Sequence, residues 1–115
     1  MNFGEVSIFQ VNPTKLDKFE SEINNLRDHF KDYAGLINLK IIKRTHRIKD
    51  MESIRAGKPA LRITRIVKSV KYILYWEFED EISHGLATKE YFEIFHNNLS
   101  KFLIMPPDKY IGISI

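Results

Sequence analysis

The chain has no cysteine among its 115 residues. This absence excludes disulfide bridges, thiol nucleophiles, Cys-ligated zinc and iron–sulfur clusters. A small domain without such cross-links depends on an apolar core, and eight Phe, five Tyr and one Trp supply bulky side chains for it. A chain of this mass removes roughly two-thirds of its surface from water on folding, which is enough for one core. We therefore expect a single domain over residues 1–115.

Long hydrophobic runs are also missing. The longest, Tyr72–Trp76, has five residues, whereas a membrane span needs roughly 20. The first residues, Met1–Glu5, have neither a basic segment nor an apolar run, so they do not resemble a secretory signal. These features predict a soluble, cytoplasmic protein with no membrane partner.

The sequence lacks the common cofactor motifs as well. Its four histidines, His29, His46, His84 and His96, do not have the spacing of metal ligands. Glycine-rich dinucleotide and phosphate loops are absent, and so is the G-x-S-x-G motif of serine hydrolases. We therefore predict neither a cofactor nor a metal site.

Four segments have the composition of β-strands. Residues 5–11 are rich in β-branched and aromatic side chains, and residues 36–47 and 110–115 alternate between apolar and polar. The run over residues 61–78 is long for one strand, which predicts a bulge or break near Lys68 and Ser69. In the last segment the isoleucines at alternate positions are expected to face inward: Ile111, Ile113 and Ile115.

Two helices separate these strands. The first begins after Asn12 and Pro13, which suit a helix start, and ends before Gly35, which suits a left-handed cap. Six apolar side chains at spacings of three and four predict its buried face: Leu16, Phe19, Ile23, Leu26, Phe30 and Tyr33.

The second helix is expected over residues 89–103, capped by Thr88 and ended by Pro106 and Pro107. Residues 79–87 are predicted to form a polar turn or a short helix. Four apolar side chains predict the buried stripe of the helix: Phe92, Phe95, Leu99 and Phe102.

The order β-α-β-β-α-β predicts an α+β, ferredoxin-like fold, with a four-stranded antiparallel sheet and both helices on one face. The third strand is apolar on both faces, because Ile73 and Tyr75 oppose Tyr72, Leu74 and Trp76. A solvated face would be more polar. We therefore expect a second copy to cover it, giving a homodimer.

The element order and the segment Val70–Leu103 resemble the antibiotic-biosynthesis-monooxygenase-like domains of the dimeric α+β barrel superfamily. The resemblance rests on Tyr75-Trp76-Glu77, the acidic turn Glu79-Asp80-Glu81, and Thr88-Lys89-Glu90-Tyr91-Phe92. It implies a homodimeric barrel whose subunits each have a cavity between sheet and helices. The family includes cofactor-free oxygenases of quinol-type aromatic compounds and haem-degrading enzymes.

The candidate site follows from that cavity. Its ligand-binding residues are predicted to be aromatic: Trp76, Tyr72, Phe92 and Phe95. Plain core packing is the alternative role for Trp76. His84 lies beside an acidic run that favours its charged form, and His96 lies beside the predicted buried stripe, so either could act as a general base. The alternatives are an exposed turn histidine for His84 and a position at the boundary with water for His96. The ligand is expected to be a small apolar aromatic compound.

A second hypothesis comes from charge. Residues 40–71 contain eleven basic and two acidic side chains, a net charge of +9, whereas the rest of the chain carries −6. Such a basic hairpin could bind a polyanion, either nucleic acid or an acidic partner. It could equally be a solvated edge that resists aggregation.

Overall fold

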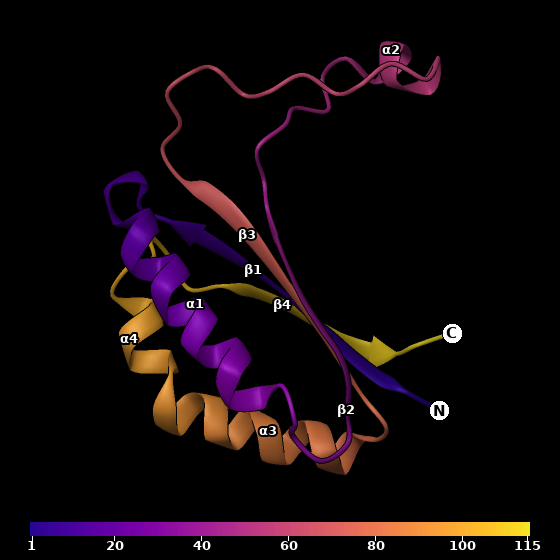
Figure 1. The fold of residues 1–115 in the computed structure, drawn as a ribbon, viewed down its shortest axis with the longest axis vertical. Helices are drawn as coiled ribbons and strands as arrows, with labels where there is room; N and C mark the ends of the chain where they lie inside the picture. The colour runs from indigo at the N-terminus through magenta and orange to yellow at the C-terminus, as the bar shows by residue number, and fades with distance from the viewer.

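One antiparallel sheet forms the centre of the computed structural model, which describes residues 1–115. Its strands lie in the order β2 (Leu36–Lys43), β3 (Val70–Phe78), β1 (Phe3–Val11) and β4 (Asp108–Ile113). β1 and β3 are central and pair in register from Phe3 with Phe78 to Val11 with Val70. Figure 1 shows this arrangement. The predicted ferredoxin-like fold is confirmed.

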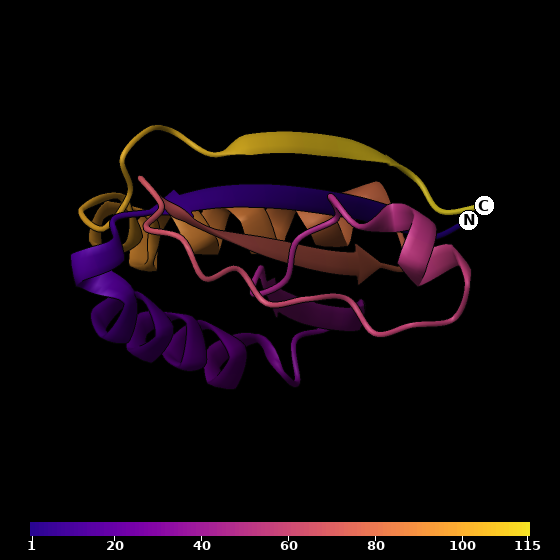
Figure 2. The ribbon, with the colours of Figure 1, turned by 90° about the horizontal axis from the view of Figure 1, so that it is seen from above.

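The helices cover one face of this sheet (Figures 1 and 2). A turn of 3₁₀ helix, η1 (Pro13–Lys15), leads into α1 (Leu16–Phe30), and α3 (Glu81–Ile94) continues into α4 (His96–Ser100). Asn12 accepts a hydrogen bond from the backbone N–H of Thr14, as expected of a residue that starts a helix. No helix is both long and apolar enough to cross a lipid bilayer.

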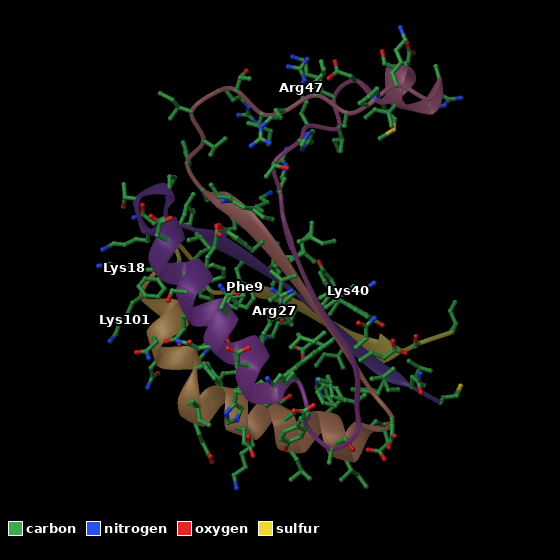
Figure 3. The ribbon with its side chains drawn as sticks, viewed as in Figure 1. Phe9, Lys18, Arg27, Lys40, Arg47 and Lys101 are labelled. Atoms are coloured by element: carbon green, nitrogen blue, oxygen red, sulfur yellow. The ribbon has the colours of Figure 1, made fainter.

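The core lies between the sheet and the helices. α1 buries four of the six side chains predicted for its apolar face, and Leu16 and Tyr33 pack at the margin. Phe9 of β1 lies between α1 and the sheet (Figure 3) and contacts the Phe19 ring at a centroid distance of 5.7 Å. β3 contributes its alternate residues to the core: Tyr72, Leu74, Trp76 and Phe78.

The predicted start of the second helix is wrong. α3 begins at Glu81, because the Asp80 side chain caps it by accepting a hydrogen bond from the Ser83 N–H at 2.8 Å. Thr88 lies inside the helix and bonds back to the carbonyl oxygen of His84. The acidic turn that resembled a loop is therefore a cap followed by the first helical turns.

The predicted buried stripe changes with it. Tyr91, Phe95 and Leu99, four residues apart, are buried, and Phe102 is partly buried. Phe92 is 46% exposed, which contradicts its predicted place in the core. Because α3 begins at Glu81, its buried stripe runs from His84 through Ala87 to Tyr91 and on to Phe95 and Leu99, and Phe92 lies beside this stripe.

β4 differs from expectation in its burial. Ile111 and Ile113 pair with Glu5 and Phe3 and so share the helix-side face, but they are 56% and 52% exposed. β4 is an edge strand, and the helices do not extend over it. Ile115 lies beyond the strand and is exposed.

The face of the sheet opposite the helices is uncovered and largely apolar at its centre. Val6 and Ile8 of β1 pair with Tyr75 and Ile73 of β3 on this side. Ile42 of β2 and Tyr110 of β4 extend the apolar surface to both edges and are 60% and 67% exposed. We call these six residues the open face.

Residues 44–69, between β2 and β3, form a projection that we call the arm. The strands predicted over 36–47 and 61–78 stop at Lys43 and start at Val70, just after the predicted break. The arm contains the short helix α2 (Met51–Arg55) and not one fully buried residue. It raises the radius of gyration to 15.7 Å, against about 13 Å for a compact domain of this length.

Candidate functional site

A buried carboxylate lies under α3, in the middle of the sheet. Glu5 is on the helix-side face of β1, in line with Ser7, Phe9 and Val11, and is only 3% exposed. A carboxylate is almost never buried this far unless other groups satisfy its oxygens.

Four donors converge on Glu5 from three strands and one helix. Its Oε1 accepts hydrogen bonds from Trp76 Nε1 at 2.9 Å and from His84 Nε2 at 2.6 Å. Its Oε2 accepts from Lys109 Nζ at 3.1 Å and from Ser7 Oγ at 3.4 Å. We call these five residues the Glu5 cluster.

Electrostatics keep Glu5 ionised despite its burial. Loss of water raises the pKa of the carboxyl group, but the hydrogen bonds from Trp76 and His84 and the charge of Lys109 outweigh that effect. The pKa of Glu5 is therefore below its ordinary value of 4.5, and near neutral pH the side chain is a carboxylate.

The protonation of His84 follows from this result. A carboxylate only accepts hydrogen bonds, so Nε2 must carry the proton that it shares with Glu5. In the neutral ring Nδ1 then holds the basic lone pair. The capped first turns of α3 hold the ring in place, against Phe3 and Phe78 at centroid distances of 5.0 and 5.6 Å. His84 is buried, which contradicts its alternative role as an exposed turn residue.

Tyr91 supplies a polar group that has no partner. Tyr91 is a buried residue of α3, and its hydroxyl is enclosed yet forms no hydrogen bond. The ammonium group of Lys109 lies 5.3 Å from the centre of the ring. Burial and the nearby charge of Glu5 raise the pKa of Tyr91 to about 12, so the hydroxyl remains a hydrogen-bond donor.

A small cavity joins these groups. Glu5, Ser7, Trp76, Tyr91 and Lys109 line it, with apolar walls from β1, α1 and β3. It is much smaller than the roughly 300–1,000 Å³ of small-molecule sites, so a bound compound would require the surrounding side chains to move. The enclosed part has room for about one water molecule. The cavity therefore brings together a hydrogen-bond donor, a cation and a carboxylate, and the imidazole of His84 contacts that carboxylate from outside the lining.

Of the four predicted ligand-binding residues, the structure places only Trp76 in this cavity. Tyr72 is on the same strand but farther along, where its ring packs on Phe19 and its hydroxyl donates to Glu20. Phe95 is buried between α1 and α3 and contacts His29 and Phe30.

Phe92 and His96 lie together on the outer side of Tyr91. Their rings are 4.6 Å apart, and His96 Nε2 is 3.3 Å from Ser100 Oγ. Neither residue lines the cavity, although the buried Nδ1 of His96 has no hydrogen-bond partner. Of the two predicted bases, the structure brings only His84 into contact with the Glu5 cluster. No group of three or more His, Asp or Glu side chains is arranged to hold a metal ion.

Sequence reasoning missed Glu5, Lys109 and Tyr91. One signal was available for Glu5: it occupies a position of the first strand whose alternate neighbours, Phe9 and Val11, are core residues. A charge at such a position indicates a buried polar site. Lys109 and Tyr91 carried no such signal, because their places depend on the register of β4 and the true start of α3.

Comparison with known proteins identifies the fold. No protein-family model and no curated protein sequence matches the chain. A candidate antibiotic biosynthesis monooxygenase from Nitrosomonas europaea superposes with a TM-score of 0.73 at 10% identity, covering 99% of this chain and 90% of that one. A conserved protein from Methanosarcina mazei gives a TM-score of 0.69 at 18% identity, with coverages of 97% and 91%.

A third similar structure has a described activity. SnoaB from Streptomyces nogalater, a cofactor-independent oxygenase, superposes with a TM-score of 0.68 at 14% identity. The alignment covers 98% of this chain and 92% of SnoaB. At these identities the chain shares the fold of proteins named as antibiotic biosynthesis monooxygenases, in agreement with the resemblance of Val70–Leu103.

Proposed function

We propose that this chain is a monooxygenase that oxidises an electron-rich, apolar aromatic compound without a bound cofactor. The observation that carries the proposal is the unpaired, buried hydroxyl of Tyr91, which shares a cavity with Lys109 and the carboxylate of Glu5. The fold shared with a cofactor-independent oxygenase supports the same reaction class.

The reaction class needs a base and an anion site. Removing a proton from an acidic ring CH₂ group makes the aromatic system a stronger electron donor to O₂. One oxygen atom of O₂ then becomes the carbonyl oxygen that replaces the two hydrogens of the CH₂ group. The other oxygen atom leaves with those two hydrogens as water, so atoms and electrons balance. An apolar cavity excludes bulk water from the substrate anion and strengthens its interactions with nearby charges.

The cluster supplies each of these groups. The carboxylate of Glu5, which lines the cavity, accepts the proton, and His84 holds that carboxylate in place by donating to it through Nε2. The Tyr91 hydroxyl donates to the substrate oxygen, and the ammonium group of Lys109 stabilises the anion. Trp76 forms a wall of the cavity and holds Glu5 in place.

The first test is oxygen uptake with anthrone, an apolar tricyclic compound with an acidic CH₂ group. The protein should consume O₂ in proportion to the product formed, and mass spectrometry should show a gain of one oxygen and a loss of two hydrogens. Protein that neither binds anthrone nor accelerates its oxidation over buffer would contradict the proposal.

Replacing Tyr91 separates function from stability. Tyr91→Phe removes a hydroxyl that has no partner, so the free energy of unfolding should stay within about 0.5 kcal/mol of wild type. The oxidation rate should fall by roughly tenfold to a hundredfold, because one donor to the developing charge is lost. Tyr33→Phe, which removes the same atom outside the cavity, should leave the rate unchanged. Equal rates for both variants would exclude the role given to Tyr91.

We also propose that a second copy of the chain covers the open face. Contiguous apolar surfaces of this kind mark interaction sites, and a symmetric pair buries the same surface on both subunits. The purified protein should therefore have twice the 13.6 kDa mass of one chain in light scattering.

Ile73→Glu places a charge at the centre of the open face and should give monomers. Ile82→Glu, at a residue of α3 that is 75% exposed on the helical side, should leave the dimer intact. Monomeric wild-type protein at micromolar concentration would contradict the proposed dimer.

A further inference from the structure

The arm overhangs the open face. In Figure 1 it leaves the end of the sheet and turns to the side away from the helices, and in Figure 2 it lies in front of the strands. Its tip, α2, has no extensive contact with any other helix or strand. The arm therefore extends over the surface that the second copy is proposed to cover.

The arm lacks the burial that holds the rest of the chain together. Its two sides are joined by a single β-bridge, His46 to Arg62, and by hydrogen bonds such as Arg47 N–H to the Leu61 carbonyl at 2.9 Å. Large apolar side chains on it are exposed, including Ile66 at 99% and Ile48 at 72%. Ordering a segment costs conformational entropy that these few contacts offset poorly, so a contact surface outside the chain is expected.

The charge of the arm indicates what that surface should be. The arm has eight basic and two acidic residues, a net charge of +6. Only Arg47 among its cations forms an ion pair, with Asp50. Figure 3 shows nitrogen-tipped side chains around Arg47. An acidic surface would complement this group.

The chain itself carries such a surface, at the other end of the sheet. The arm joins the start of β3, and the acidic turn Glu79-Asp80-Glu81 follows its end. All three of these side chains are exposed, and none of them forms an ion pair.

Two sheets related by a two-fold axis can meet face to face in two ways. If the axis runs along the strands, the two basic arms lie at the same end and repel one another. If the axis runs across the strands, each arm lies at the end where its partner has the acidic turn. Electrostatic complementarity favours the second arrangement, because it replaces two like-charge contacts with two opposite-charge contacts.

We propose that the arm of each copy closes over the edge of the partner's sheet and contacts the partner's acidic turn. The contact rests on the proposed dimer and adds to it a second, polar interface outside the open face. The arm then acts as a clasp that sets the relative direction of the two sheets.

Charge reversal tests the clasp through the dimer dissociation constant, measured by sedimentation equilibrium at low salt. Arg62→Glu with Arg65→Glu should weaken the dimer by about tenfold or more, and so should Glu79→Lys with Glu81→Lys. A chain that carries all four changes should recover most of the affinity, because the charges are exchanged. In high salt the dissociation constants of the variants should approach that of wild type, because salt screens the charges.

A matched control changes the same charge on the helical layer. Lys18→Glu with Lys101→Glu, on α1 and just after α4 (Figure 3), should leave the dissociation constant within about twofold of wild type. An unchanged or tighter dimer for the Arg62 and Arg65 variant would overturn the clasp while leaving the dimer itself in place. A monomeric wild-type chain would overturn both and would leave the arm available for a polyanion.

Discussion

Glu5→Ala should lower the free energy of unfolding by about 3–5 kcal/mol, the range measured when one partner of a buried ion pair is removed. The substitution leaves the Trp76 N–H, His84 and the Lys109 ammonium group without their shared acceptor, and two of these three side chains are buried. It also opens a cavity under α3. Denaturant unfolding followed by the fluorescence of Trp76, the only tryptophan, measures the loss directly.

Glu5→Gln is the conservative companion. The glutamine side chain keeps the shape and one acceptor oxygen but has no charge. The free energy of unfolding should therefore fall less than in Glu5→Ala. Ser7→Ala removes the weakest donor, 3.4 Å from Glu5, and should cost less than either. If Glu5→Ala were as stable as wild type, the cluster would not be a buried, charged network.

The same carboxylate makes stability depend on pH. Because the pKa of Glu5 is lower in the folded chain than its ordinary value of 4.5, its contribution is complete above that value. The contribution is lost as the pH falls from 4.5 through the folded pKa. Glu20, Asp50, Glu77 and Asp80 also have lowered pKa values, so wild type alone does not isolate the effect. The difference in stability between wild type and Glu5→Gln should narrow below pH 4.5.

Gly35→Ala should cost about 2–4 kcal/mol, from two separate causes. Gly35 has φ = +86°, a left-handed conformation that costs other residues about 1–2 kcal/mol. A Cβ atom there would lie 2.4 Å from Ser83 Oγ and 2.6 Å from Ser83 Cβ, so α3 would have to move. The carbonyl oxygen of Gly35 also accepts a hydrogen bond from the Glu79 N–H at 2.8 Å. This bond holds the turn before β2 against the turn that follows β3.

Two variants separate those causes. Gly57→Ala, in the arm, has φ = +95° and open space around the added atom, so it should show the backbone cost alone. Adding Ser83→Gly to Gly35→Ala removes the clash and should recover part of the loss. If Gly35→Ala and Gly57→Ala lowered the midpoint of thermal unfolding equally, the clash with Ser83 would not contribute to the destabilisation.

The order of elements could be predicted because most of them carry a strong local pattern. The apolar spacing from Leu16 to Phe30 matches one face of α1, and the alternation from Tyr72 to Phe78 matches β3. Each pattern repeats several times along its element. It therefore identifies the helix or the strand even when the predicted ends are off by a few residues.

The second helix and the site could not be predicted in the same way. The start of α3 depends on one side chain, Asp80, and an Asp among acidic residues is equally compatible with a turn. In the Glu5 cluster, Trp76 and Lys109 lie 71 and 104 positions from Glu5, so only strand register brings these side chains together. His84 was singled out as a candidate base for its acidic sequence neighbours, yet its partner in the fold is Glu5, from the other end of the chain.

The central place of β1 has a consequence for how the molecule assembles. β1 is the first strand of the chain, yet its neighbours are β3 and β4, and Ile8 pairs with Asp108. Pairing β1 with β4 closes a loop that contains most of the chain. The entropy cost of closing a loop grows with the logarithm of its length, and such non-local pairings slow folding. β4 is also a six-residue edge strand with every residue exposed, so its docking gains little burial. We expect β4 to join last during refolding and to exchange its amide hydrogens first in the native state.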